Sequence, residues 1–195
     1  MKPWVVAITG ASGAPYAVRL LQALCSEKVP VQLIISGHGW RLLETEAGVS
    51  SVEELERSVG GGWDNITVFD DVDRGATPAS GSARASGMVI CPCSMGTVAA
   101  LAHGTSRSLV ERAGDVALKE RRPLIVVPRE TPLSLVHLRN LTQLAEAGAT
   151  VIPAAPGFYN KPVGISDLVD FVVQRVVDQM NLEIELAPRW SGGVE

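Results

Sequence analysis

Residues 4–16 read WVVAITGASGAPY, and this stretch decides the fold. An apolar run from Trp4 to Ile8 ends at Thr9 and Gly10, and a turn rich in glycine and serine leads to Pro15. Proline is accepted in the first turn of a helix because an N–H at that position has no intrahelical partner. The stretch therefore predicts a buried strand, a tight turn and the start of a helix.

The same alternation continues along the chain. Further apolar runs cover residues 31–35, 88–91, 124–127 and, more weakly, 151–152, and helical patterns cover 109–121, 134–147 and 167–182. Continuous apolar runs are typical of strands that are buried on both faces. We therefore expect a doubly wound, Rossmann-like or flavodoxin-like α/β fold, with a mainly parallel sheet and helices on both faces.

Length and composition narrow the class of protein. The 195 residues suit a single domain, which we place at residues 1–186, followed by a tail at 187–195 that is either flexible or docks on a neighbouring subunit. The net charge of −4 argues against a nucleic-acid partner, and no apolar run is long enough to cross a membrane. The N-terminus does not resemble a signal peptide, so we expect a cytoplasmic protein.

The cysteines do not indicate a disulfide framework or a metal site. Cys25, Cys91 and Cys93 are an odd number of thiols, and the three histidines are scattered. A structural zinc site needs four ligands at close spacings, which this sequence does not offer. We interpret the three thiols as small buried residues and expect no metal.

Candidate binding residues follow the predicted strands. Ligands of open α/β sheets bind at the carboxyl ends of the strands. The turn after the first strand offers backbone N–H groups and a helix N-terminus to a phosphate, although a plain connecting turn would look the same. Hydroxyl-bearing residues follow two more strands and suit a mononucleotide, but Ser94 and Thr97 are also typical helix caps. The candidates are Gly10, Ala11, Ser12, Ser36, Ser94, Met95, Gly96 and Thr97.

Charged residues supply the remaining candidates. Arg129 and Glu130 follow a buried strand, where the arginine suits a phosphate or carbonyl group and the glutamate suits proton transfer. A surface ion pair is the alternative. Lys119, Tyr159 and Arg175 are possible anion ligands. Arg175 is expected on the apolar side of its helix, whereas Lys119 is also compatible with a solvated helix end.

Taken in order, these segments resemble the flavin prenyltransferase family of the UbiX type, which includes the small subunits partnered with phenolic-acid decarboxylases. The resemblance covers nearly the whole chain, and its central motifs are specific in combination. The segments that carry it are residues 10–13, Ser36, 80–82, 87–95, 112–121, 129–133, His137, Asn140, 148–149, 156–162 and 167–178.

The resemblance implies a reaction and its ligands. The family transfers a dimethylallyl group from dimethylallyl phosphate to N5 and then C6 of reduced FMN, without a metal. The prenylated flavin then serves a partner decarboxylase of the UbiD type. The family forms dodecamers with active sites at subunit interfaces, so Lys119 is expected to reach a neighbour's site. The sequence does not distinguish a monophosphate donor from a pyrophosphate.

The resemblance also implies roles for residues. FMN would be held by Gly10, Ala11, Ser12, Ser36, Ser94 to Thr97 and Arg129. The donor phosphate would be held by Lys119, Tyr159 and Arg175. Glu130 and an acidic residue of the 44–46 segment would move protons, and we choose Glu44 over Glu46.

Two departures and two alternatives accompany this interpretation. Ala83 stands where the family commonly has an aromatic residue, which predicts a larger donor pocket. Arg107 and Ser108 replace a common Asp-Asn pair.

One alternative is an FMN-dependent decarboxylase of the cysteine-decarboxylase type, in which His38 would act as the base. The other is a flavin-binding protein without catalysis.

Overall fold

A six-stranded parallel sheet forms the centre of the computed structural model, which describes residues 1–189. The order of the strands is β3-β2-β1-β4-β5-β6, and each neighbouring pair is parallel. This confirms the predicted doubly wound α/β fold. The strands are β1 (Trp4–Ile8), β2 (Val31–Ile35), β3 (Ile66–Asp70), β4 (Gly87–Cys93), β5 (Leu124–Pro128) and β6 (Thr150–Val151).

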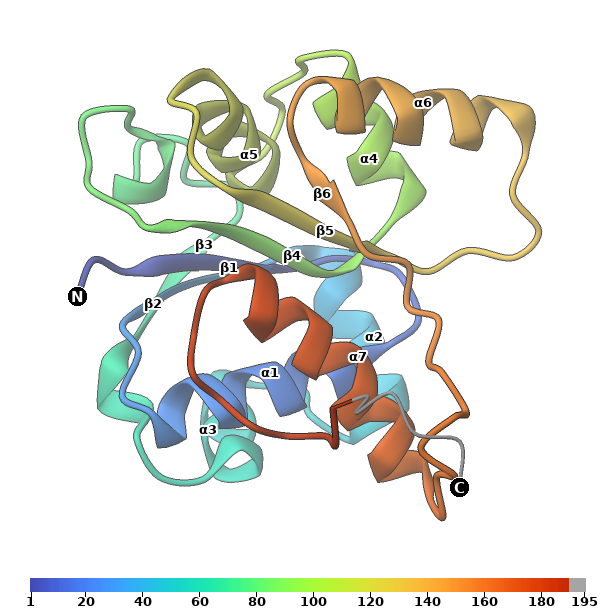
Figure 1. Cartoon of the computed structure of the whole chain (residues 1–195). Helices are drawn as coiled ribbons and strands as arrows, with labels where there is room; N and C mark the ends of the chain where they lie inside the picture. Colours follow the sequence, from blue (N-terminus) through green and yellow to red (C-terminus); the bar gives the residue numbers. More distant parts are fainter. Residues whose placement is uncertain (190–195) are drawn as a thin grey trace.

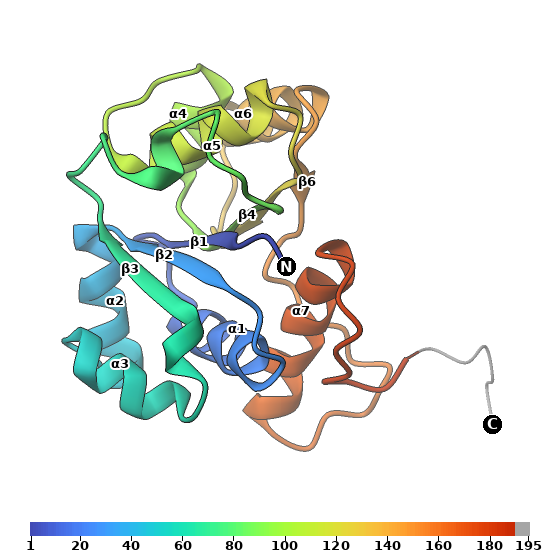
Figure 2. The ribbon, with the colours of Figure 1, turned by 90° about the vertical axis from the view of Figure 1, so that its left-hand side faces the viewer.

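Helices cover both faces of the sheet (Figures 1 and 2). One face carries α1 (Ala14–Ser26), α2 (Gly37–Ala47), α3 (Val52–Val59) and α7 (Ile165–Gln179). The other carries α4 (Met95–Ala102), α5 (Leu109–Lys119) and α6 (Leu135–Glu146). Each face has its own apolar core, and the two cores share the sheet, because side chains of a strand point alternately to its two faces.

Several elements were absent from the sequence prediction. Strand β3 lies at the sheet edge and buries only Ile66, so it lacks the continuous apolar run of the central strands. Helices α2 and α3 were also not predicted, whereas α4 follows Ser94, which the sequence had indicated as a possible helix cap. The segment between β3 and β4 contains a short 3-10 helix at Thr77–Ala79.

The carboxyl ends of β1 and β4 form the point where the chain turns to opposite faces of the sheet. After β1 the chain enters α1 on one face, and after β4 it enters α4 on the other. Buried Thr9 joins the two strand ends, because its hydroxyl donates to the Pro92 carbonyl at 3.0 Å and accepts from the Ser94 N–H at 2.8 Å. Such a divergence leaves a crevice for a ligand.

Helix α2 packs close to this crevice. A Cβ atom built on Gly39 would lie 2.4 Å from the carbonyl oxygen of Ile8, and one on Gly10 would lie 2.4 Å from Cβ of His38. Larger residues at either position would push α2 away from the end of β1. Glycine at these two positions therefore sets the shape of the crevice.

The end of the described chain is attached to α7. The backbone N–H groups of Leu186 and Ala187 both donate to the Gln174 side chain. Residues on both sides of the expected boundary between domain and tail, at residue 186, therefore contact α7. Residues 190–195 of the predicted tail lie outside the described residues. Within residues 1–189, no helix combines the length and the apolar character required to cross a bilayer.

Candidate functional site

Three helix N-termini converge on one cavity at the carboxyl edge of the sheet. Ser36, Ser94 and Ser108 cap α2, α4 and α5, and each side chain accepts a hydrogen bond from the backbone N–H three residues later. The three serines line a cavity of about 280 Å³, which we call the serine cavity, together with Gly10, His38 and Thr97. Helix N-termini carry partial positive charge, so this arrangement is suited to an anion such as a phosphate.

Two acidic side chains also reach the serine cavity, and both already have partners. Asp71 accepts the Val110 N–H at 2.9 Å, which holds the start of α5 against the end of β3. Glu111 accepts from the Arg107 guanidinium at 2.8 Å and from the Thr105 hydroxyl at 3.2 Å. The Arg107 guanidinium partly neutralises the Glu111 carboxylate, whereas the partner of the Asp71 side chain is a neutral N–H group.

The turn after β1 differs from its expected form. Oε2 of Glu46, on α2, accepts the N–H groups of Gly13 and Ala14, each at 2.8 Å. The sequence argument expected N–H groups of this turn to be free for an external phosphate. That was wrong for these two, because an internal carboxylate takes them. An anionic ligand therefore has its better site in the serine cavity.

The charge state of Glu46 follows from its surroundings. Burial alone would raise the pKa of this carboxyl group. Hydrogen bonds from the Gly13 N–H, the Ser12 hydroxyl and the Ala14 N–H, with the positive charge of Arg129, outweigh that effect and lower the pKa below its ordinary value of 4.5. Glu46 is therefore an anion at neutral pH.

Glu44 lies elsewhere on the same helix. Its side chain is exposed, and residues two positions apart on a helix face different directions. Of the two acidic residues in the 44–46 segment, the structure brings Glu46 to the turn and leaves Glu44 away from it. The sequence preference for Glu44 therefore has no geometric support.

Arg129 and Glu130 occupy the expected place at the end of β5. Nε of half-buried Arg129 donates to the Ser12 carbonyl at 3.3 Å, which brings its guanidinium group to the turn that Glu46 also contacts. Glu130 is exposed, and its Oε1 accepts the Thr131 N–H at 3.1 Å. Within residues 1–189, no ion pair joins Arg129 to Glu130, so the surface-pair alternative is not what the structure shows.

Tyr159 and Arg175 meet at a second cavity of about 300 Å³ beside α7. The Tyr159 ring packs edge-on against Phe171, with ring centroids 5.6 Å apart. Arg175 was expected on the apolar side of α7, and this was wrong: the buried side is formed by other residues, and Arg175 is exposed. The buried residues are Val172, Val173, Gln174, Val176 and Val177.

Lys119 is separated from the other candidates. Helix α5 begins at the serine cavity, is 11 residues long and ends with Lys119, a length of roughly 16 Å. There Lys119 contacts Glu120 at 2.5 Å, and a Cβ atom built on Gly81 would lie 2.6 Å from Nζ of Lys119. Ala83, in the same segment, lines a cavity of only about 10 Å³. The space beside Ala83 is therefore too small for a prenyl chain within one subunit.

Three functional candidates were missed from the sequence: Thr9, Asp71 and Ser108. Ser108 could have been found, because Ser108 and Glu111 have the spacing of a helix-capping motif. Thr9 and Asp71 carry no such local signal, since their partners lie 85 and 39 positions away. Their roles depend on the tertiary structure alone.

The cysteines are buried core residues, as predicted. Burial raises the pKa of Cys91 to about 12, and it also raises that of Cys93, so neither thiol is a nucleophile at neutral pH. Across residues 1–189, no three or more His, Cys, Asp or Glu side chains are grouped as metal ligands would be.

Comparisons with known proteins agree on one family. The flavoprotein family model matches residues 1–177. The flavin prenyltransferase UbiX of Pseudomonas aeruginosa is 46% identical over 193 residues, which cover 95% of this chain and 92% of that protein. The structure of AnUbiX (PadA1) in complex with FMN and dimethylallyl pyrophosphate has a TM-score of 0.91 and 38% identity, and covers 99% of both chains. A dodecameric FMN-dependent UbiX-like decarboxylase from Escherichia coli O157:H7 has a TM-score of 0.89 and 41% identity, covering 97% of this chain and 100% of its own.

Proposed function

Because this chain belongs to the flavoprotein family and, within it, to the flavin prenyltransferases of the UbiX type, we propose that it transfers a dimethylallyl group from dimethylallyl phosphate to N5 and C6 of reduced FMN. The observation that carries this proposal is the serine cavity, which Gly10 lines, together with the group that Ser12 forms with Glu46 and Arg129 two residues further along the same turn. The first suits a phosphate, and the second suits the polar edge of a flavin ring.

The serine cavity fits the phosphate end of FMN. Capped helix N-termini and hydroxyl groups are hydrogen-bond donors to a phosphate, and they carry the partial positive charge that a dianion needs. We assign Ser36, Ser94 and Thr97 to the phosphate and ribityl chain, with Gly10 and Ala11 allowing close approach and Met95 and Gly96 completing the loop. Ser12 and Arg129 would contact the flavin ring, which supplies the electron-rich nucleophile when it is bound and reduced.

Proton movement is assigned to two carboxylates. Glu46 lies at the turn that carries Ser12, and its lowered pKa keeps it a carboxylate at neutral pH, which is the form that can accept a proton. Glu130 follows Arg129 at the end of β5 and is open to solvent, which allows protons to exchange with water. We therefore propose Glu46, in place of Glu44, together with Glu130 for this role.

The donor phosphate is assigned to Tyr159, Arg175 and Lys119. Transfer breaks the allylic C–O bond of the donor and releases inorganic phosphate, so cations and a phenol that stabilise the leaving group favour the reaction. Tyr159 and Arg175 lie at one cavity of the chain. Lys119 lies at the far end of α5, so we propose that it acts in the site of a neighbouring subunit.

A homo-oligomer, specifically a dodecamer, is therefore part of the proposal. Exposed apolar side chains support it, because large exposed apolar patches on a protein surface mark sites of contact with other proteins. These are Leu133, Leu135, Val136 and Leu138 around the start of α6, and Phe158, Val163 and Ile165 before and at the start of α7. The prenylated flavin would then pass to a decarboxylase of the UbiD type.

Phosphate release tests the proposed reaction. The protein is incubated without oxygen with dimethylallyl phosphate and either reduced or oxidised FMN, and inorganic phosphate is measured. We expect release only with reduced FMN. A parallel series with dimethylallyl pyrophosphate, measuring pyrophosphate, shows which donor is used. Release that does not need reduced flavin would indicate a phosphatase and would contradict the proposal.

A further inference from the structure

The segment after α7 folds back along that helix and is held by one buried side chain. Gln174 is 4% exposed, and its Nε2 donates to the Ile184 carbonyl at 2.8 Å. Its Oε1 accepts the N–H groups of Leu186 at 2.5 Å and Ala187 at 3.2 Å. A single amide thus binds three backbone groups of the segment, which fixes the path of the chain toward Arg189.

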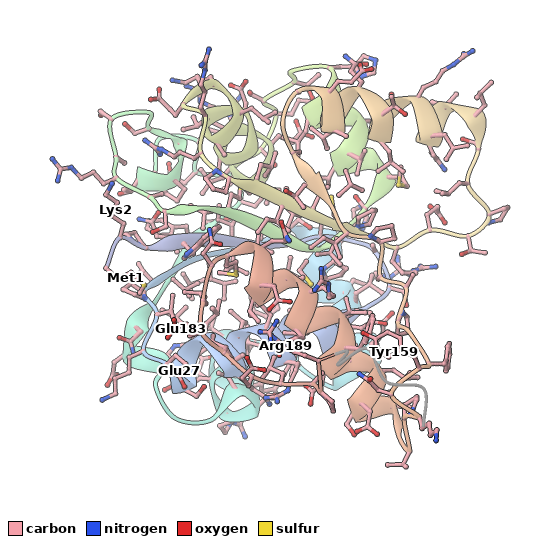
Figure 3. All side chains as sticks on the ribbon, in the orientation of Figure 1. Met1, Lys2, Glu27, Tyr159, Glu183 and Arg189 are labelled. Carbon is pink, nitrogen blue, oxygen red and sulfur yellow. The ribbon has the colours of Figure 1, made fainter. Side chains whose placement is uncertain are left out.

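This path brings Arg189 to the cavity that Tyr159 and Arg175 line. Figure 3 labels Tyr159 and Arg189, both on the side of the molecule where α7 lies. Arg189 donates to Oδ1 of Asp178 at 3.0 Å, and Arg175 donates to Oδ2 of the same carboxylate at 2.9 Å. Two guanidinium groups from separate segments therefore share one carboxylate at the cavity.

The charges explain why two cations can lie so close together. Asp178 is only 14% exposed at its side chain, and it separates two guanidinium groups that would otherwise repel each other. Gln174 also donates to Asp178, at 2.9 Å, so one residue fixes both the carboxylate and the segment that carries Arg189. Arg189 has a second acidic partner, because its Nε donates to Glu185 at 3.0 Å. Each arginine side chain is about half exposed and has five N–H donors, more than these carboxylates use.

We propose that Arg189 is a further ligand of the donor phosphate, beside Tyr159 and Arg175, and that Gln174 is the residue that positions it. This rests on the proposed function of Tyr159 and Arg175. An arginine fork binds a phosphate through two parallel hydrogen bonds, so a second fork adds affinity and fixes the orientation of the leaving group. The end of the described chain thus adds a second guanidinium group to the proposed anion site.

Binding of dimethylallyl phosphate, measured by calorimetry on the full-length protein, tests the proposal without relying on turnover. We expect Arg189→Ala to weaken donor binding about tenfold, as loss of a charge-assisted hydrogen bond does. Arg189→Lys should restore part of the affinity. Gln174→Leu, which cannot hold the segment, should weaken donor binding like Arg189→Ala. Arg57→Ala, on exposed α3, is the matched control and should bind like the wild type.

Two further readouts separate positioning from general damage. FMN affinity should be unchanged in Arg189→Ala and Gln174→Leu, and in turnover both should raise the KM for the donor more than they lower kcat. Unchanged donor affinity in Arg189→Ala, or equal losses of donor and FMN affinity in Gln174→Leu, would overturn the inference. Failure of the proposed function is a separate result: the wild type would bind the donor in an Arg189-dependent way and yet release no phosphate with reduced FMN.

Discussion

At the scale of single residues, Glu46 decides what the first turn can bind. A helix N-terminus with free N–H groups attracts an external anion, but here the carboxylate of the same chain takes two of them. We propose that the phosphate is thereby directed to the serine cavity, while the turn is left with Ser12 and Arg129 beside a fixed negative charge. One side chain thus separates the two ends of the proposed flavin site.

The first prediction concerns the stability that Glu46 contributes. Its pKa is lowered on folding, so the stabilisation is complete above the ordinary value of 4.5 and is lost as the pH falls through the lower folded value. Glu46→Gln should lower the free energy of unfolding by about 1.5 kcal/mol at pH 7, because hydrogen bonds to a charged acceptor are lost. Denaturant unfolding at pH 7 and pH 3 measures the difference. A gap between the two proteins that stays the same at pH 3 would contradict this account.

At the scale of elements, serine-capped helices form the cavity. Helices α2 and α4 follow β2 and β4, which lie on either side of β1 and are parallel, so both helices begin at the same edge of the sheet. Helix α5 follows a loop after α4, and Asp71 at the end of β3 holds its start at that edge. Helix α5 then runs from the cavity to Lys119 at the opposite end. The same serine side chains therefore stabilise the helix starts and line the proposed ligand cavity.

The second prediction compares two caps. Ser94→Ala and Ser134→Ala each remove the N-cap side chain of a helix, and each should cost about 1 kcal/mol of stability. Only Ser94 lines the serine cavity, so only Ser94→Ala should also weaken FMN binding, by several-fold. Quenching of flavin fluorescence measures the affinity. Equal FMN affinity in the two variants would show that the phosphate is not bound at this cap.

What the sequence predicts depends on whether the signal is local. The central strands and the long helices were predicted because continuous apolar runs and helical spacing are local patterns. Edge strand β3 has too little burial to show such a run. At the site, Ser36, Ser94 and Arg129 could be predicted because each comes directly after an apolar run that forms a strand. The choice of Glu46 over Glu44 and the exposure of Arg175 could not be predicted, because they depend on which side of a helix faces its neighbour.

At the scale of the whole molecule, one subunit does not bring all of the proposed site residues together. The flavin residues lie at the carboxyl edge of the sheet, and Tyr159 and Arg175 lie beside α7. Lys119 is about the length of α5 away from the serine cavity. An assembly of several subunits would bring this lysine to a second copy, and the account therefore makes the oligomer part of the enzyme.

The third prediction uses mixed oligomers. Lys119→Ala and Glu130→Gln should each abolish most of the prenyl transfer, since each removes one component of every site. When the two variants are co-expressed with different tags and purified through both tags, some sites combine an intact Lys119 with an intact Glu130, and activity should return in part. Phosphate release measures it. Mixed oligomers as inactive as the parents would contradict a site shared between subunits.

The most direct test of the central claim is the mass of the flavin after reaction. Purified protein is incubated without oxygen with reduced FMN and dimethylallyl phosphate, and the flavin is extracted and analysed by mass spectrometry. The account predicts a flavin heavier by one five-carbon prenyl unit, formed by the wild type and not by Lys119→Ala. Unmodified FMN in the wild-type reaction, with the pyrophosphate and longer donors also tried, would contradict it.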